Sequence, residues 1–511
     1  MDFENLSWVK QFHVEHGRPI RTLHIGNIAN NAYNNAKLLR EIGLISDVIC
    51  YDYYHIMGTP EWEDADFNVK NLDHFFPRWS DLNLGDFIRP DWFVQGPLEL
   101  CIDYLIAKNN NENFLQKKIW KILSQINQTE KSSKFNITYL CYNTGFKIIT
   151  RLGFKFKNLI IRIQSSRYYP LRPKNKTFKY ELLNEKIQEI FPDRAVEVTK
   201  DDFYRFSDFL LKKWKRLFSN YDVVIGYSTD GIYPLLTNTP YIAFEHGTIR
   251  DIPYQKTSQG RLCALTYSLA NHVFVTNFDC KKSADFLSPN RYSLINHPFD
   301  ENHSDEIMGA DELRIKLLQD LDSDFLFFFP TRHDWVEGTG YADKANNVFL
   351  NAFAKLRHLG FRVGAVCCEW GQNIEDSKKL LSDSYVDDYV QWSDPMATVQ
   401  FERTAMACDY VVDQFKLGSF GGILFKAMAA GSPVMTYLNE EMLKEQFSEM
   451  PPVLNCKCEK DIIDAIKSIY EKPEAKEILS QKSRDWINRH HSKRDTINKQ
   501  LAQFKVLLQY K

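Results

Sequence analysis

Short apolar runs alternate with amphipathic helical segments along two stretches of the chain. The first stretch has apolar runs at Leu23–Ile25, Asp47–Tyr51, Asp222–Tyr227, Tyr241–Phe244 and His272–Thr276. The second has them at Phe325–Phe329, Arg362–Cys367, Tyr389–Trp392, Ala407–Val412 and Val434–Tyr437. Short apolar runs bounded by polar turns are typical of strands buried on both faces of a parallel sheet. The pattern therefore predicts two doubly wound α/β domains.

The breaks in this alternation predict the domain boundaries. We expect a first domain over residues 1–300, interrupted by an insertion at about residues 60–215, and a second domain over residues 301–490. The segment Glu61–Pro97 is rich in Trp, Asp and Pro, which favours loops with short helices. His297–Gly309 lacks periodicity and is interpreted as the linker, and a last helix is expected within residues 491–511.

A glycine-dotted turn leads into a helix within Asp413–Pro433. It follows an apolar run and contains Gly418, Gly421 and Gly422, and a short helix ends at Gly431. A loop whose backbone N–H groups crowd one point before a helix N-terminus is a ready anion site. The strand–turn–helix order predicts a nucleotide diphosphate at the carboxyl edge of a parallel sheet. The alternative is a helix that needs glycines only to pack closely on the sheet.

Polar residues also follow other predicted strands. In the first half these are Gly26 with Asn27, and His246 followed four residues later by Arg250. The alternatives are an ordinary turn with asparagine caps and a structural histidine. In the second half Arg332 follows a strand and Lys344 precedes a helix, so that the two cations can converge on one anion.

Bulk composition excludes little. The 511 residues carry a net charge of −2, which gives no global attraction to nucleic acid or membrane. The ten cysteines follow no disulfide or zinc spacing, so reduced, mostly buried thiols in a cytoplasmic protein are expected. The N-terminus does not have the pattern of a signal peptide, and no run approaches the roughly 18 apolar residues of a spanning helix.

One segment departs from this balance. Lys131–Tyr180 contains twelve Lys or Arg residues, ten Phe or Tyr residues and no Asp or Glu. Three interpretations remain: solvated lysines around two strands, an anionic acceptor or inner membrane surface bound peripherally, and, as the weakest, nucleic acid.

Several motifs, taken in order, resemble those of the retaining glycosyltransferases of GT-B fold, of the family-four type (glycosyl transferases group 1). They lie at Gly26–Gly43, Phe244–Pro253, Val275–Asn277, Phe329–Lys344 and Leu417–Val434, and the middle insertion is not covered. The resemblance implies two Rossmann-like domains facing across a cleft, with the final helix packing back toward the first domain. It further implies a metal-independent enzyme without cofactor, which moves a sugar from a nucleotide-sugar donor to a glycan or lipid-linked acceptor in polysaccharide or glycoconjugate synthesis.

The same resemblance assigns roles to individual residues. It implies that Arg332 and Lys344 bind the donor diphosphate and act with His246 in catalysis. Thr248 and Arg250 would contact the acceptor or the sugar. The donor-binding residues that it implies are Gly26, Asn27, Gly418, Ser419, Phe420, Gly421, Gly422 and Lys426.

Two further classes remain open: a catalytically weakened GT-B protein that binds nucleotide sugar or glycan as a scaffold, and a sugar-nucleotide epimerase. The epimerase mechanism needs several carboxylates in the cleft, and the sequence does not indicate them. Asp322 and Asp324 resemble a metal-binding pair of the other glycosyltransferase fold, but they precede a strand rather than follow it, so we reject them as ligands.

Lys426 stands where the family carries a glutamate that accepts hydrogen bonds from the ribose, and Gly418 replaces the other family glutamate. An ammonium group has donors but no acceptor. The resemblance therefore predicts that Lys426→Glu strengthens nucleotide binding in a calorimetric titration, and unchanged or weaker binding would count against that expectation.

Overall fold

The computed structural model describes residues 5–68, 72–126, 174–197, 202–203, 206, 208–336, 343–472 and 474–509. The basic segment Lys131–Tyr180 lies outside these residues, except that Lys174–Tyr180 begin helix α7 (Lys174–Ile190). In the part described, no helix is long and apolar enough to cross a membrane. The nine cysteines described are free, and all but Cys458 are buried.

Seven of the described strands form one parallel sheet in the order β3-β2-β1-β4-β5-β6-β7. Their bounds are β1 (Arg21–Ile25), β2 (Ile45–Tyr51), β3 (Phe93–Gly96), β4 (Val223–Tyr227), β5 (Ile242–Glu245), β6 (His272–Val275) and β7 (Tyr292–Leu294). The strand order reverses between β1 and β4, and such a switch point is where open α/β sheets bind ligands.

Six further strands form a second parallel sheet in the order β10-β9-β8-β11-β12-β13. They are β8 (Phe325–Phe329), β9 (Val363–Cys368), β10 (Val390–Ser393), β11 (Tyr410–Val412), β12 (Val434–Thr436) and β13 (Leu454–Asn455). Every residue of β8 is buried, as expected for a strand covered on both faces. The predicted fold class is confirmed: the chain has two Rossmann-like domains in the GT-B arrangement.

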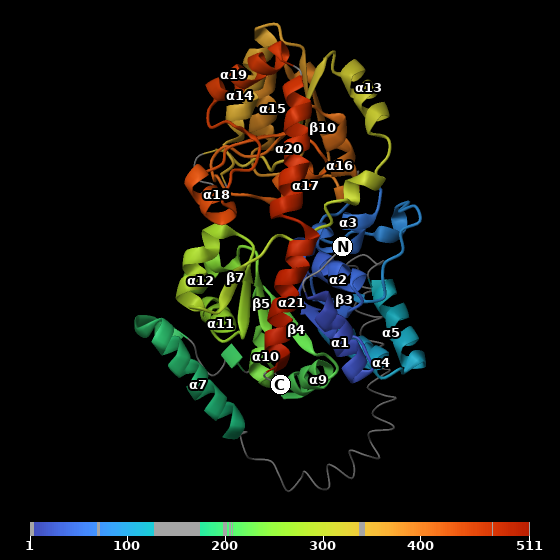
Figure 1. Ribbon diagram of the computed structural model, residues 1–511, viewed down its shortest axis with the longest axis vertical. Helices are drawn as coiled ribbons and strands as arrows, with labels where there is room; N and C mark the ends of the chain where they lie inside the picture. The colour runs from blue at the N-terminus through green and yellow to red at the C-terminus, as the bar shows by residue number, and fades with distance from the viewer. Residues whose placement is uncertain are drawn as a thin grey trace.

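Helices cover both faces of each sheet, and the two domains are stacked along the long axis of the molecule (Figure 1). The first domain carries α1 (Leu6–His16), α2 (Asn31–Glu41), α3 (Pro60–Asp64), α4 (Leu98–Asn109), α5 (Asn113–Ile126), α7, α9 (Asp208–Phe218), α10 (Ile232–Thr237), α11 (Ser258–Ser268) and α12 (Lys281–Leu287). The second carries α13 (Ala310–Asp320), α14 (Asn346–His358), α15 (Ile374–Asp383), α16 (Thr398–Ala407), α17 (Gly422–Ala429), α18 (Glu440–Phe447), α19 (Glu459–Glu471) and α20 (Glu474–His490).

The final helix, α21 (Lys493–Gln509), returns to the first domain (Figure 1). Ile497, Leu501 and Phe504 are fully buried among residues of α1, α2 and the first sheet. Gln500 Nε2 also donates a hydrogen bond of 2.8 Å to Asn35 Oδ1 on α2. The helix therefore joins the second domain to the core of the first.

Three short strands were missed by sequence reasoning: β3, β7 and β13. Phe93–Gly96 was expected among loops and short helices, but it forms β3 at the edge of the first sheet, paired with β2. The strand has only four residues, and all four are buried. A strand so short shows no alternation of polar and apolar positions that the sequence pattern could reveal.

Helix α21 offers a direct test of the domain connection. Phe504→Ala should lower the free energy of unfolding by about 3–5 kcal/mol, because it removes a fully buried ring from a packed core. Val506→Ala on the same helix is the control: its side chain is 45% exposed, so a change within about 0.5 kcal/mol is expected. Urea unfolding measures both, and equal effects would contradict the packing of α21.

Candidate functional site

A cavity of about 420 Å³ lies between the two domains. The loops after β1 and β5 and helix α3 line it from the first domain, and loops after β8, β9 and β10 with the start of α17 line it from the second. Because the strands of both sheets are parallel, their carboxyl-end loops converge on this one space. A cavity of this size suits a ligand as large as a cofactor or nucleotide.

Five of the residues predicted from the sequence line this cavity: His246, Arg250, Gly421, Gly422 and Lys426. A Cβ atom added at Gly421 or Gly422 would meet no atom within 4 Å, so the backbone at the start of α17 is uncovered on that side. The helix N-terminus therefore opens onto the cavity with free access to its backbone, as an anion site requires.

Three cations from both domains gather beside the cavity. Lys344 lies between the loops that follow β8 and β11, where the strand order of the second sheet reverses. Its N–H donates to Asp334 O (2.6 Å), and its carbonyl accepts from Phe415 N (2.9 Å). Burial lowers the pKa of Lys344; Asp413 opposes this shift, and the charges of Arg332 and Arg250 lower the pKa further. The charges of Arg332 and Arg250 thus both act on Lys344, and an anion placed near the three cations would relieve that repulsion.

The three cations differ in their partners. Arg332 lies 3.4 Å from Asp334, and Arg250 forms an ion pair with Asp279 on the first domain. Lys344 forms no ion pair among the residues that the structure describes. Neither Arg332 nor Lys344 is among the side chains that line the cavity, and the Arg332 side chain is 45% exposed.

Gly26 and Asn27 shape the first loop from within. Gly26 has φ +88°, and a Cβ atom there would lie 2.2 Å from the carboxylate of Asp230, whose pKa burial raises to about 7. Asn27 is buried: its side chain donates to Asn30 and to Gly58 O, and accepts from Tyr33 N at the start of α2. Both residues therefore fix the loop, and neither lines the cavity.

The remaining predicted residues also lie outside the cavity lining. Thr248 donates to Ser228 Oγ at 3.0 Å. Gly418 has φ +72° and its carbonyl accepts from Asn439 N, so it forms the turn before the helix. Ser419 is half-buried, and Phe420 packs in the second core against Phe447 and Trp486.

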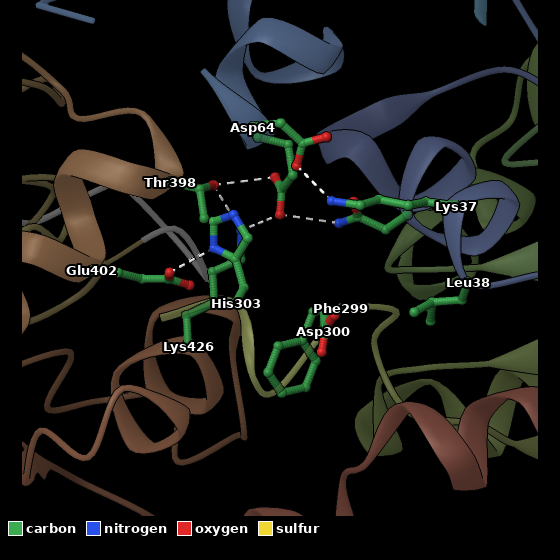
Figure 2. A pocket seen from close by; sticks show the side chains of 11 residues that line it. Lys37, Leu38, Asp64, Phe299, Asp300, His303, Thr398, Glu402 and Lys426 are labelled. Carbon is green, nitrogen blue, oxygen red and sulfur yellow. Dashed lines mark hydrogen bonds and ion pairs between the residues drawn. The ribbon is translucent and has the colours of Figure 1, made fainter. Parts of the chain in front are cut away.

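Lys426 has an ionic partner that the sequence could not indicate. Its Nζ donates to Glu63 Oε1 on α3 (2.8 Å) and to Thr398 Oγ1 (2.9 Å), and Thr398 Oγ1 donates to Glu63 Oε2 (3.1 Å). Figure 2 shows Lys426 and Thr398 beside a second, small cavity at this point. Burial would raise the pKa of Glu63, but the charge and hydrogen bond of Lys426 outweigh it and lower that pKa to about 2.

This contact changes the expectation for position 426. A glutamate there would face the buried carboxylate of Glu63, and two like charges in a desolvated site repel each other strongly. Lys426→Glu alone is therefore expected to weaken nucleotide binding rather than to strengthen it.

Two histidines in the cavity wall have ring nitrogens without a hydrogen-bond partner in the part of the chain that the structure describes. Neither ring nitrogen of His246 nor Nε2 of His297 has a partner among the described residues. Burial lowers the pKa of His246 to about 4 and that of His297 to about 3, and Arg250 contributes to both shifts. His297 stacks on Phe425 of α17 at 5.4 Å. The sequence had suggested only a linker at His297, because no periodic element contains it.

Aromatic side chains complete the cavity wall. Trp62 and Trp370 line it from opposite domains, and Trp370 Nε1 donates to Pro330 O at 2.7 Å. Rings fixed in this way offer flat faces to a planar or sugar ligand.

No protein-family model and no curated protein matches the chain. Among solved structures, it resembles HepE of Anabaena in complex with UDP and glucose (14% identity, 58% of this chain and 81% of that one, TM-score 0.45). It also resembles sucrose-phosphate synthase of Thermosynechococcus elongatus (14%, 61% and 80%, TM-score 0.45) and a glycosyltransferase of Rickettsia africae (11%, 96% and 99%, TM-score 0.47). Similarity this low carries no information on the reaction.

The neutral state of His297 makes stability depend on pH. Its pKa is about 3 in the folded protein and about 6.5 when unfolded, so below pH 6.5 the unfolded chain binds a proton that the folded chain does not. Its stabilising contribution is present above pH 6.5 and is lost as the pH falls, by at most about 1.4 kcal/mol per unit. His297→Gln should flatten the decline in unfolding free energy between pH 6.5 and 4.5, whereas curves parallel to the wild type would contradict a buried neutral ring.

Proposed function

We propose that the protein is a glycosyltransferase, which moves a sugar from a nucleotide-diphosphate sugar to a glycan or lipid-linked acceptor with retention of anomeric configuration. The observation that carries this proposal is the grouping of Arg250, Arg332 and Lys344 beside the interdomain cavity, next to the uncovered start of α17. Cations and helix N-termini together are the groups that bind a diphosphate.

The arrangement supports catalysis by charge stabilisation. In sugar transfer, negative charge develops on the leaving diphosphate. Arg332 and Lys344 on the second domain and Arg250 on the first would stabilise that charge from two sides. Because these side chains supply the positive charge, the proposed reaction needs no divalent cation.

His246 is assigned to the transferred sugar. Its imidazole is neutral at physiological pH and has two ring nitrogens without partners, so it offers one hydrogen-bond donor and one acceptor. A hydroxyl group uses both kinds of partner. The ring nitrogens carry almost no exposed surface, so the ring must turn, or the cleft must adjust, when the sugar binds.

The acceptor is assigned to the first domain. A third cavity, of about 300 Å³, lies in this domain on the other side of α3 and has Glu61 in its wall. Trp62 and Glu63 on the same helix line the interdomain cavity instead. The wall of the third cavity contains Trp79, Phe87, Phe93 and Trp120, which suits an apolar or sugar portion of an acceptor. We also propose that the basic segment Lys131–Tyr180 binds the inner membrane face peripherally, and that the protein acts in the synthesis of surface polysaccharide.

A non-catalytic scaffold is the second candidate. It is favoured by Lys426, whose ammonium has no acceptor for the ribose and is paired with Glu63. An epimerase is disfavoured, because Glu63 is the one carboxylate among the described residues lining the interdomain cavity, and Lys426 neutralises it.

Lys344→Met tests the proposed reaction. Nucleotide release from a panel of nucleotide sugars, with and without acceptor glycans, should show turnover of one donor. The substitution should reduce kcat/KM for that donor by about 10²-fold or more, because it removes a fixed charge from the leaving group.

Lys355→Met provides the matched control. Lys355 lies on α14, the helix that begins just after Lys344, but its side chain is 60% exposed and pairs with Glu459. It should leave turnover unchanged. Tight binding of a nucleotide without turnover of any donor would favour the scaffold, and equal loss in both variants would contradict the role of Lys344.

A further inference from the structure

Glu63, Lys426 and Thr398 form a closed triad across the domain boundary. Each of the three hydrogen bonds measures between 2.8 and 3.1 Å, and Asn34 Nδ2 adds a fourth contact to Glu63 Oε1 at 3.2 Å. The side chains of Lys426 and Glu63 are only 20% and 10% exposed. The two charges are therefore largely desolvated, and each needs the other to remain buried.

The triad joins segments that approach only when the two domains are close together. Glu63 is on α3 of the first domain, whereas Thr398 begins α16 and Lys426 lies on α17 of the second. Asp66 pairs with Arg403 of α16 beside it, and Ala397 packs with Trp62 in a small apolar cluster. Helix α3 is thus docked on the second domain by both charge and apolar contact.

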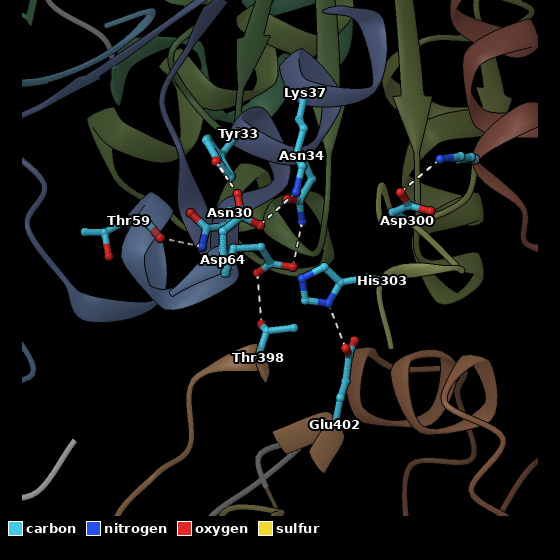
Figure 3. Close-up of polar contacts among 12 residues, drawn as sticks. Asn30, Tyr33, Asn34, Lys37, Thr59, Asp64, Asp300, His303, Thr398 and Glu402 are labelled. Atoms are coloured by element: carbon cyan, nitrogen blue, oxygen red, sulfur yellow. Dashed lines mark hydrogen bonds and ion pairs between the residues drawn. The ribbon is translucent and has the colours of Figure 1, made fainter. Parts of the chain in front are cut away.

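Further ion pairs surround the triad at the linker. Figure 3 shows Asn34, Lys37 and Asp64 of the first domain facing Thr398 and Glu402 of the second, with His303 between them. His303 Nδ1 lies 2.7 Å from Glu402, and Lys37 pairs with Asp64 at 2.8 Å. These groups line a cavity of about 20 Å³, which has room for one water molecule. Charged and polar groups of both domains therefore meet at the linker beside the triad.

The triad is also part of the cavity wall. Glu63, Thr398, Lys426 and Asn34 line both the interdomain cavity and the small cavity of the network. A ligand in the larger cavity thus meets a wall that exists only while the two domains are closed.

We propose that Glu63 is a positioning residue of the donor site: it holds Lys426 and Thr398 in one triad across the cleft, so that the nucleotide-binding wall is complete only in the closed arrangement of the domains. The nucleotide part of this inference rests on the proposed function, whereas the closure part rests on the contacts alone. Nucleotide affinity and domain closure are then linked, and each favours the other.

An exposed interdomain ion pair away from the cavity serves as the matched control. Lys281 on α12 pairs with Glu445 on α18 at 2.5 Å, but the two side chains are 37% and 58% exposed. Exposed pairs contribute little to stability. Lys281→Met with Glu445→Gln should therefore change neither closure nor affinity.

The first experiment uses Glu63→Gln, which keeps the shape of the side chain and removes its charge. Calorimetric titration with UDP, GDP and ADP identifies the diphosphate that the wild type binds. The variant should bind it at least about fivefold more weakly, within the usual range of coupling between linked sites. Glu63→Asp, which keeps the charge, should recover part of the loss. Affinity equal to the wild type, or greater, would overturn the proposal.

The second experiment measures closure without any ligand, by small-angle X-ray scattering. Glu63→Lys and Lys426→Glu should each raise the radius of gyration, because each opposes two like charges, and the combined reversal should restore the wild-type value. A double variant as open as the single variants would overturn the pairing, and so would unchanged scattering in all three.

The two experiments separate this inference from the proposed function. If the wild type binds none of the three diphosphates, the proposed function fails, while the scattering series still decides whether the triad closes the domains. A thermal unfolding scan of each variant identifies any that fails to fold, and Thr398→Val then replaces it, with weaker binding and a larger radius as the expected results.

Discussion

The cost of burying charge between two domains is the constraint on which this structure depends. Parallel sheets direct their carboxyl-end loops at one another, and these loops bring several cations together beside one cavity. Lys426 is neutralised by Glu63 across the cleft. Lys344, also largely removed from water, forms no ion pair among the described residues. The Glu63–Lys426 pair holds the domains together, whereas the charge of Lys344 leaves a site where an anion is favourable.

Lys426 and Lys344 have different roles in the cleft. The triad at Glu63 forms one side of the cavity and the start of α17 lines another, while Arg332 and Lys344 lie outside the lining. The rings of Trp62 and Trp370 and the neutral His246 lie in the wall between them. A ligand with a planar base, a diphosphate and a sugar has a counterpart in this wall for each of its parts, which is why we favour transfer from a nucleotide sugar.

The sequence predicted the local features well and the long-range contacts poorly. Strands such as Phe325–Phe329 and the turn at Gly421 were correctly placed, because apolar runs and glycines act on their immediate neighbours. Glu63 was not recognised, because its partner Lys426 is 363 positions away on the other domain. Phe420 was expected at the donor, but its ring packs in the core: the motif fixes the path of the backbone and does not say which side of the turn each side chain occupies.

The central claim is that a nucleoside diphosphate binds in the interdomain cavity with its phosphates at the cation cluster. A crystal structure of the protein grown with the diphosphate that it binds most tightly tests this most directly. The account predicts that both phosphates lie within hydrogen-bond distance of Arg332, Lys344 and the backbone at the start of α17, with the Glu63–Lys426 pair intact. A nucleotide bound elsewhere, or bound in the cleft with its phosphates away from Arg332 and Lys344, would contradict it.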